Sequence, residues 1–291
     1  MAGTSARVLA GENDLARSVD ELAVCTAIRP LQGNLFEISF RAPEIAGRAQ
    51  PGEFAQIWVD TGPVPLLRRP FSFSRADSGS GAIAFYLAAI GEGSRRLQRF
   101  RPGDQARILG PLGQGFTLPE RPGRSALVSG GLGAAPFPLL AERLQARGEE
   151  LVWINGAATR SGLYPDDMVP RGIGEIVLLT EDGSRGQVGR VTAGLLPRLQ
   201  GLDRVYACGP NQMLAAVAGQ VATAAPAPDV EVSIEAPMGC GFGTCLGCAI
   251  PLLGRGARDE SLLGLCCRQG PVLPGAVIDW ERLLQQPAHL G

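Results

Sequence analysis

The C-terminal part of the chain contains the stretch Cys240-Gly241-Phe242-Gly243-Thr244-Cys245-Leu246-Gly247-Cys248. Three cysteines in C-x4-C-x2-C spacing, with a further cysteine downstream, are typical of a plant-type [2Fe-2S] cluster. The interspersed glycines give the backbone the freedom to bring several thiolates together from one tight loop, and they let N–H groups approach the cluster sulfides. The stretch therefore predicts an iron–sulfur site in a protein that transfers single electrons.

The fourth ligand of such a cluster would be Cys266 or Cys267, which follow as a doublet. Adjacent side chains of an extended chain point in opposite directions, so we expect only one of the two to face the cluster. The alternatives are a zinc site with four cysteine ligands, which usually has C-x2-C pairs at both ends, or a set of buried cysteines. Because only one such pair is present, the spacing favours iron–sulfur. We expect Cys25 and Cys208, in apolar runs, to be small buried side chains.

Composition limits the other possibilities. The chain has 291 residues, 45% of them hydrophobic and 19% charged, with a net charge of −1. This length suits two or three domains, and the charge predicts no affinity for nucleic acid or an anionic membrane. No run of about 18 apolar residues predicts a membrane span. The N-terminus lacks the apolar core of a signal peptide, so we expect a cytoplasmic protein with reduced thiols. The single histidine, His289, argues against a Ser-His-Asp triad and against Rieske ligation.

The pattern of apolar segments predicts a multi-domain β and α/β protein. After a mobile tail at 1–20, residues 21–118 contain short apolar segments between Gly/Pro turns, which favour an antiparallel β-barrel. Residues 119–225 alternate strands and helices, which indicates a parallel α/β sheet. Residues 226–291 hold the cysteines. The expected strands are 22–28, 35–40, 54–59, 71–74, 83–90, 106–109, 125–129, 151–154, 176–180, 204–208, 230–235 and 249–253, and the expected helices are 94–100, 134–147, 192–199 and 211–222.

A second candidate site lies on a barrel strand, in Leu67-Arg68-Arg69-Pro70-Phe71-Ser72-Phe73-Ser74. An arginine there can pair with a pyrophosphate while a nearby hydroxyl contacts a flavin ring or phosphate, and Pro70 fixes the backbone between them. The strand 86–90 then ends in Gly91-Glu92-Gly93-Ser94, where the start of a helix offers free N–H groups to a phosphate. The alternative is a surface arginine pair beside a core strand.

A third candidate site is Ser129-Gly130-Gly131-Leu132-Gly133-Ala134-Ala135-Pro136, which follows a strand and opens a helix. Gly131 and Gly133 would let the backbone approach a pyrophosphate, although the dinucleotide fingerprint has Gly or Ala where this chain has Pro136. Cys208-Gly209-Pro210 is a second such turn at the same sheet edge. Glu181-Asp182-Gly183-Ser184 ends a third strand there. The alternative for the glycine-rich segment is a simple tight strand–helix turn. The segment 181–184 could contact a ribose or nicotinamide or be an ordinary acidic turn.

In this order, the three segments resemble the ferredoxin-reductase superfamily and, within it, the electron-transfer subunits of two-component dihydroorotate dehydrogenases; the resemblance covers residues 22–280. It implies an electron relay that needs no general acid or base from this chain. An FMN-containing partner would oxidise dihydroorotate, with NAD as the acceptor. The resemblance implies [2Fe-2S] on the cysteines, NAD(H) at Gly131, Gly133, Pro136, Cys208, Gly209 and Pro210, and FAD on Arg69, Pro70, Phe71, Ser72, Tyr86, Leu87, Ala88, Gly93 and Ser94, where relatives usually have threonine at 94.

The resemblance also selects Cys267 as the fourth ligand, beside Cys240, Cys245 and Cys248, because a Gly-Pro-Val segment follows it at the family's spacing. Cys266 would then be structural. The sequence leaves open a related reductase subunit for a sulfide- or ferredoxin-linked partner, a free-standing reductase, and a zinc-stapled binding module. It also leaves NAD and NADP open, since Arg160 could meet a 2′-phosphate or be a solvated loop arginine.

Overall fold

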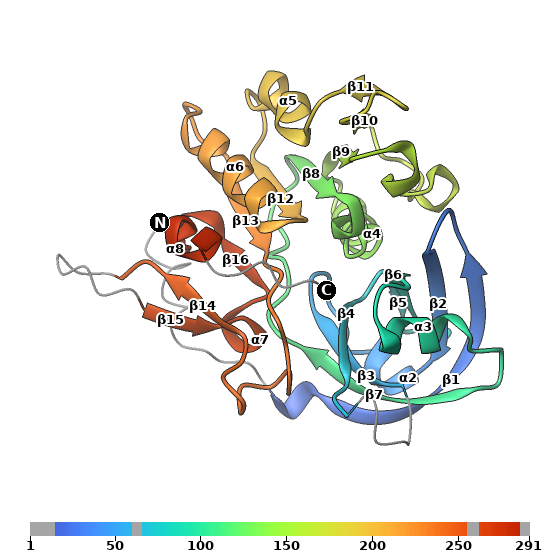
Figure 1. Ribbon diagram of the computed structural model, residues 1–291. Coiled ribbons are helices and arrows are strands. Elements are labelled where there is room, and N and C mark those ends of the chain that lie inside the picture. The colour runs from blue at the N-terminus through green and yellow to red at the C-terminus, as the bar shows by residue number, and fades with distance from the viewer. Residues whose placement is uncertain (1–14, 60–65, 255–261, 286–291) are drawn as a thin grey trace.

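The computed structural model describes residues 15–59, 66–254 and 262–285. The first layer is a seven-stranded antiparallel sheet with the order β4-β3-β7-β1-β2-β6-β5 (Figure 1). Its edge strands β4 and β5 are consecutive in the chain and are joined by Phe73 and Ser74, so the sheet curls into a barrel. The bounds are β1 Val19–Pro30, β2 Leu35–Arg41, β3 Phe54–Trp58, β4 Arg69–Ser72, β5 Arg75–Asp77, β6 Ala82–Ala88 and β7 Gln105–Leu112, with helices α2 Pro43–Ala46 and α3 Glu92–Gln98.

The barrel interior is filled by alternate residues of its strands. Phe36, Ile38 and Phe40 of β2 are fully buried, and the ring of Phe40 lies edge-on to that of Phe85, with centroids 6.3 Å apart. This alternation is the signal that predicted the barrel, and the predicted fold class is confirmed. Strand β5 and helix α2 were not predicted, because segments of three or four residues carry too little periodicity.

The expected mobile tail at 1–20 is wrong at its C-terminal end. Residues Leu15–Arg17 form a 3-10 turn (η1) and strand β1 begins at Val19. The Arg17 guanidinium donates to the Glu53 carboxylate at 3.0 Å and to the Arg48 carbonyl at 2.5 Å, and the Ser18 hydroxyl donates to the Pro111 carbonyl at 2.7 Å. These contacts fasten the segment to the barrel. Residues 1–14 and His289 lie outside the described residues.

The second layer is a seven-stranded sheet with the order β11-β10-β9-β8-β12-β13-β16, parallel except for β16. The first strand, β8, has β9 and β10 on one side and β12 and β13 on the other. The chain therefore reverses direction across the sheet between β8 and β12, and such a switch point is where nucleotides bind in open α/β sheets. The bounds are β8 Arg124–Gly130, β9 Glu150–Ala157, β10 Glu175–Thr180, β11 Gln187–Val188, β12 Arg204–Cys208, β13 Asp229–Ser233, β16 Val272–Pro274, α4 Phe137–Gln145, α5 Val191–Leu195, α6 Asn211–Ala222 and α8 Trp280–Gln285.

The C-terminal segment shares the second sheet. Strand β13 pairs in parallel with β12, and β16 pairs antiparallel with β13. The domain boundary expected between residues 225 and 226 would assign β13 and β16 to the cluster domain. Their strand pairing instead makes them part of the second sheet. The reason is that helix α6 crosses from β12 to β13 and completes another strand–helix–strand unit. Only β14 (Ala249–Leu252), β15 (Leu262–Leu265) and α7 (Cys266–Gln269) stand apart, beside the barrel (Figure 1).

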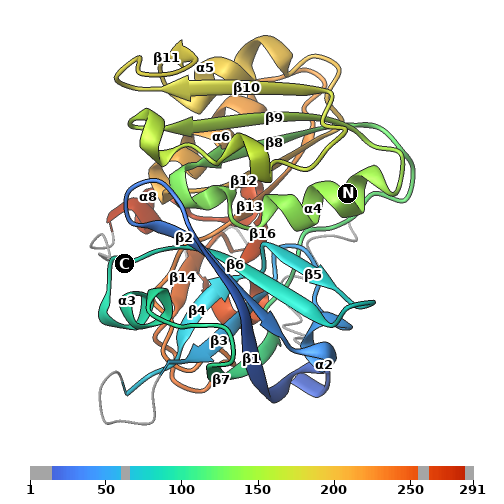
Figure 2. The ribbon, with the colours of Figure 1, turned by 90° about the vertical axis from the view of Figure 1, so that its right-hand side faces the viewer.

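Helix α4 lies between the second sheet and the barrel (Figure 2). Phe137 and Leu140 pack with Trp153 of the sheet and Tyr86 of the barrel, whereas Leu139 belongs to the barrel core. One helix is thus buried against both layers and fixes their relation. No helix in the described parts of the chain is long and apolar enough to cross a membrane. The cytoplasmic location stays a prediction.

Glu53 should make stability depend on pH. It is 3% exposed, and burial raises its pKa to about 7 although Arg17 opposes the rise. Between about pH 4.5 and 7 the folded protein keeps a proton that the unfolded chain has lost, so stability falls as pH rises through this window. Between pH 5 and 8 we expect the wild type to lose about 1–3 kcal/mol of unfolding free energy through Glu53. Its melting temperature should therefore fall by several degrees more over this range than that of Glu53→Gln. Glu44→Gln, at an exposed position of α2, is the control. An unaltered pH profile in Glu53→Gln would contradict this assignment.

Candidate functional site

A β-hairpin brings two of the predicted cluster cysteines together. Cys248 precedes β14 and the doublet follows β15, and the antiparallel register Ala249↔Leu265 sets these ends opposite each other. The Cys266 N–H donates to the Cys248 carbonyl at 3.0 Å. The Sγ atoms of Cys248 and Cys267 lie 3.2 Å apart, and the hydrogen bond from Cys267 lowers the pKa of Cys248 to about 6. The contact with the Cys267 thiol therefore favours the thiolate form of Cys248.

Cys240 and Cys245 form the second pair of sulfurs. The Sγ of Cys240 accepts from the N–H groups of Thr244 at 3.3 Å and Cys245 at 3.4 Å. Burial disfavours its thiolate, but these donors, Phe242 N–H and the Cys245 side chain outweigh burial and lower the pKa of Cys240 to about 7. The loop thus stabilises a negative sulfur through its own backbone, as a ligand for iron requires.

The doublet cysteines have different surroundings. They lie in the single helical turn α7, so the expectation of an extended chain at the doublet is wrong. A helical turn also separates successive side chains, and Cys266 Sγ points to the Ile234 carbonyl at 3.6 Å instead of toward Cys248 Sγ. Cys266 is fully buried, and burial raises the pKa of its thiol. The geometry therefore supports Cys267 as the ligand and Cys266 as a packing residue.

The sulfur arrangement suits a binuclear cluster. Two thiolates on one tetrahedral ion at about 2.3 Å would lie about 3.8 Å apart, close to the separation of Cys248 and Cys267. Within the described ranges, no three His, Cys, Asp or Glu side chains are close enough to enclose one metal ion. Cys240, Cys245, Cys248 and Cys267 would therefore hold a two-iron cluster, which would supply one-electron transfer, more readily than they would enclose a single zinc ion.

The cysteine loop is held between two polar side chains, and glycine makes both contacts possible. A Cβ at Gly241, where φ is +83°, would lie 2.7 Å from Cγ and Nε2 of Gln56. A Cβ at Gly243, where φ is +91°, would lie 2.3 Å from Cδ of Arg268. Sequence reasoning missed Gln56 and Arg268. The available signal for Gln56 was a lone amide within the apolar strand Phe54–Trp58.

The cysteine loop carries an exposed leucine, Leu246, between its second and third cysteines. Leu246 has φ +59°, a conformation that is strained for a bulky side chain, and it is 63% exposed. Leu67 is also exposed and lies 3.9 Å from the position of a Cβ on Gly239, at the start of the loop. These two leucines flank the cysteines with apolar surface.

The structure distinguishes the two arginines of the barrel motif. Arg68 donates to both carboxylate oxygens of Asp20, at 2.7 and 3.0 Å, and its guanidinium lies 5.4 Å from the centre of the Trp58 ring. In the described chain Arg69 donates only to the carbonyls of Leu67 and Arg68. A Cβ at Gly93 would lie 2.8 Å from Cγ of Arg69. Arg69 and the start of α3 are thus adjacent, and no carboxylate of residues 15–59, 66–254 or 262–285 pairs with the guanidinium.

The other predicted flavin residues divide between two faces of β4 and β6. Leu87 is buried in the barrel core, and Phe71, which is half-buried, packs against that core. Tyr86 and Ala88 face the second layer. The Tyr86 hydroxyl has no partner within the described ranges, and burial raises its pKa to about 12. Pro70 and Ser72 are half-buried on β4.

The Ser94 hydroxyl is occupied by its own turn. It accepts from the N–H groups of Ile90 and Gly91, both at 3.1 Å, and donates to the Gly91 carbonyl at 3.2 Å. The serine therefore shapes the loop that leads into α3. Gly91 has open space where a side chain would be, so the main chain at this turn is accessible to a ligand.

The two glycines of the third motif have separate roles. A Cβ at Gly133 would lie 2.1 Å from the carbonyl oxygen of Cys208, so the turns after β8 and β12 are in direct backbone contact there. Gly131 has φ +55° and open space around it. Pro136 precedes α4 and Pro210 precedes α6. Gly131 is therefore the position where the chain leaves room for a ligand.

Burial also shapes the sheet edge beside Gly131. It raises the pKa of Cys208 to about 12, with the nearby carboxylate of Glu235 adding to the rise. Burial likewise raises the pKa of Glu235. At a third strand end, the Ser184 hydroxyl accepts from the Arg160 N–H at 2.7 Å. The loop after β9, which contains Arg160, and the loop after β10, which contains Ser184, are thus in contact. The sequence had suggested each of them separately as a nucleotide contact.

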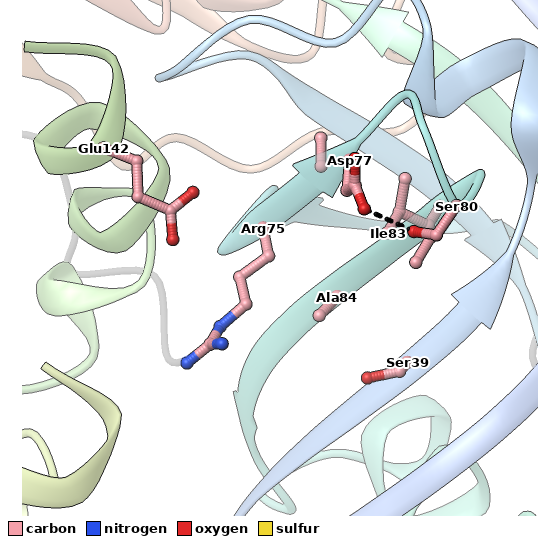
Figure 3. Close-up of a pocket in the computed structure, with 9 residues that line it drawn as sticks. Ser39, Arg75, Asp77, Ser80, Ile83, Ala84 and Glu142 are labelled. Atoms are coloured by element: carbon pink, nitrogen blue, oxygen red, sulfur yellow. Dashed lines mark hydrogen bonds between the residues drawn. The ribbon is translucent and has the colours of Figure 1, made fainter. Parts of the chain in front are cut away.

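A hollow on the far side of the barrel contains none of the predicted site residues. It is lined by strand β5 and its neighbours and by Glu142 of α4 (Figure 3). There the Ser80 hydroxyl and the Gly79 N–H lower the pKa of Asp77. Because it offers neither sulfur ligands nor an open strand–helix turn, this hollow is not the candidate redox site.

Comparison with known proteins agrees with this geometry. Residues 235–279 match the model of the iron–sulfur cluster binding domain of dihydroorotate dehydrogenase B. A solved NADH-dependent reduced ferredoxin–NADP oxidoreductase has a TM-score of 0.79 at 24% identity, covering 91% of this chain and 92% of that one. The ferredoxin reductase of carbazole 1,9a-dioxygenase has a TM-score of 0.60 at 21% identity, covering 70% and 66%. The chain thus has a ferredoxin-reductase-like fold, with a C-terminal segment that matches an iron–sulfur cluster binding domain.

Two relatives identify the family. The dihydroorotate dehydrogenase B (NAD(+)) electron transfer subunit of Desulforamulus reducens is 34% identical over 260 residues, which cover 88% of this chain and 96% of the relative. The corresponding subunit of Bacillus caldolyticus is 35% identical over 239 residues, covering 81% and 90%. This chain belongs to the family of dihydroorotate dehydrogenase B electron transfer subunits. The resemblance drawn from the motifs is confirmed.

The doublet gives a direct test of the ligand assignment. We expect Cys267→Ser to lose the visible absorption and the iron content of the cluster, because Cys248 would lose its paired sulfur. Cys266→Ser should keep both, since Cys266 Sγ points to a carbonyl. Iron analysis and absorption spectra of the two purified variants decide the matter. A Cys266→Ser protein without iron beside an iron-loaded Cys267→Ser protein would reverse the assignment.

Gly133→Ala should destabilise the contact between the turn after β8 and the turn after β12. The added methyl group would collide with the Cys208 backbone, and overpacking of this kind costs about 1–3 kcal/mol. We expect a fall of several degrees in the melting temperature. Gly219→Ala, in helix α6 with open space around it, is the matched control and should stabilise the protein slightly. Equal melting temperatures for Gly133→Ala and the wild type would show that the turns are not in contact.

Proposed function

We propose that this chain is the electron-transfer subunit of an NAD-linked flavin iron–sulfur oxidoreductase, passing electrons between an FMN-containing dihydroorotate dehydrogenase subunit and NAD. The observation that carries the proposal is the pairing of Cys248 and Cys267, whose Sγ atoms lie 3.2 Å apart. The adjoining cysteine loop contacts Gln56 of barrel strand β3 through Gly241. The names of the relatives at 34% and 35% identity supply the substrate and the acceptor.

The cofactors implied are FAD, a [2Fe-2S] cluster and exchangeable NAD(H). When bound, FAD converts between the two-electron chemistry of nicotinamide and the single electrons that the cluster carries. Arg69 would pair with the FAD diphosphate. Two observations support this role: its guanidinium has no carboxylate partner in the described chain, and its side chain lies against Gly93, beside the open turn at Gly91. The unpartnered Tyr86 hydroxyl, on the face of β6 toward the second layer, would contact the flavin.

The second sheet would receive the nicotinamide nucleotide. Gly131 leaves open space at the switch point between β8 and β12, so its main chain can approach the diphosphate. Cys208, held as a neutral thiol by burial, and the neighbouring Glu235 lie at the same edge. Arg160, in the loop after β9, and Ser184, in the loop after β10, lie farther from the switch point and are hydrogen-bonded to each other. The chain's own residues thus bind and orient while the cofactors carry the electrons.

The face around the cysteine loop suits the partner subunit. Leu67 and Leu246 are exposed beside the sulfurs, and a second chain that covered them would bury apolar surface and exclude water from the loop. A dehydrogenase docked there would receive or deliver electrons at the shortest distance from the cluster.

Affinity purification of the tagged chain from its own host tests this function. We expect a brown-yellow complex that contains an FMN protein and reduces NAD when dihydroorotate is added. The chain alone should oxidise NADH with an artificial dye but should not turn over dihydroorotate. Recovery of a sulfide- or ferredoxin-linked partner, or a colourless preparation with stoichiometric zinc, would contradict the proposal.

A further inference from the structure

The Gln56 side chain is a buried amide that the fold leaves unpaired. It is 0% exposed, and neither its Nε2 nor its Oε1 has a hydrogen-bond partner among the residues described. Burying a polar group without a hydrogen-bond partner destabilises the folded state. Native structures contain few such groups, and a redox role or a bound water or ion is among the reasons for which they are kept.

Gln56 lies on the outer face of the barrel, toward the cysteines. Its strand neighbours Ala55 and Ile57 point into the barrel core. Phe54, on the same face as Gln56, packs in one cluster with Cys248 and Cys267. The outer face of β3 is therefore the surface on which the cysteine segment rests.

Gln56 lies between β4, which carries the predicted flavin residues, and the cysteine loop. Gln56 is directly opposite Pro70 of β4 in the sheet register. At its other end, Nε2 and Cγ lie 2.7 Å from the position of a Cβ on Gly241, the residue after Cys240. Any residue other than glycine at 241 would displace the amide from the loop.

We infer that the Gln56 carboxamide donates a hydrogen bond to a sulfur of the [2Fe-2S] site and thereby raises the reduction potential of the cluster. The inference rests on the proposed function. Reduction adds one negative charge to the cluster, so an N–H donor stabilises the reduced form more than the oxidised form. Hydrogen bonds to the sulfurs are among the factors that set the potentials of such clusters. The buried position of Gln56 keeps water from replacing this donor.

An EPR-monitored redox titration of the holoprotein tests the inference. Gln56→Met keeps the length of the side chain and removes the donor. We expect reduction of its cluster to become about tenfold less favourable, a shift of about 59 mV to more negative potential for a one-electron couple. Leu109→Met, at the position opposite Gln56 on β7, is the matched control and should keep the wild-type potential.

Equal potentials for wild type and a fully loaded Gln56→Met would overturn the inference. If Gln56→Met does not load its cluster, wild-type protein labelled with ¹⁵N only in glutamine side chains decides. Pulsed EPR of its reduced cluster should show a nitrogen coupling, and absence of that coupling would also overturn the inference. Failure of the cluster assignment in the proposed function is distinguishable, because the wild type would then show no cluster signal at all. A partner other than a dihydroorotate dehydrogenase would leave the signal and the effect of Gln56→Met unchanged.

Discussion

The convergence of sulfur atoms from two separate segments is the constraint on which the rest of this structure depends. Cys240 and Cys245 come from one glycine-rich loop, whereas Cys248 and Cys267 meet only because the hairpin β14–β15 closes. Thiolates repel one another, so a fold that gathers them must supply compensating donors. Backbone N–H groups of Thr244, Cys245 and Cys267 do so. The site is therefore prepared for positive metal ions before they bind.

The same constraint explains how the layers are joined. The cysteine segment leaves the second sheet after β13 and returns to it through β16, while its loop rests on β3 of the barrel through Gln56 and Gly241. Helix α4 connects the same two layers elsewhere. The loop, the flavin-type strand and the nucleotide-type turns are consequently held in one packed body. Electron transfer benefits from this arrangement, because it requires fixed distances between cofactors.

Most of the architecture could be predicted from the sequence because it follows from local patterns. Strand alternation predicted the barrel, strand–helix alternation predicted the second sheet, and helix 211–222 was predicted with the bounds that the structure shows. The membership of Asp229–Ser233 in the second sheet was missed, since the Pro/Ala-rich segment before it resembles a domain linker. The ordered residues from Leu15 were missed because their anchor, Glu53, lies far along the chain.

The site was predictable where chemistry is encoded by spacing and not where it depends on tertiary contact. Cysteine spacing indicated the loop. The choice of Cys267 over Cys266 came only from the family resemblance, because the expectation of an extended chain at the doublet was wrong; this choice stays a prediction, which the contact between Cys248 and Cys267 favours. Arg68 is paired with Asp20, whereas Arg69 contacts only backbone carbonyls in the described chain. This difference could not be predicted, because Asp20 lies 48 positions away in the sequence. Gln56 is a glutamine in an apolar strand, and only the packed structure shows that its amide meets the cysteine loop.

The measurement that tests this account most directly is the EPR spectrum of the purified wild-type protein after reduction with dithionite, recorded together with its iron and zinc content. The account predicts two irons per chain and an axial or rhombic signal from a spin-half binuclear centre. Anaerobically prepared protein that carries a full complement of zinc and gives no such signal would contradict it.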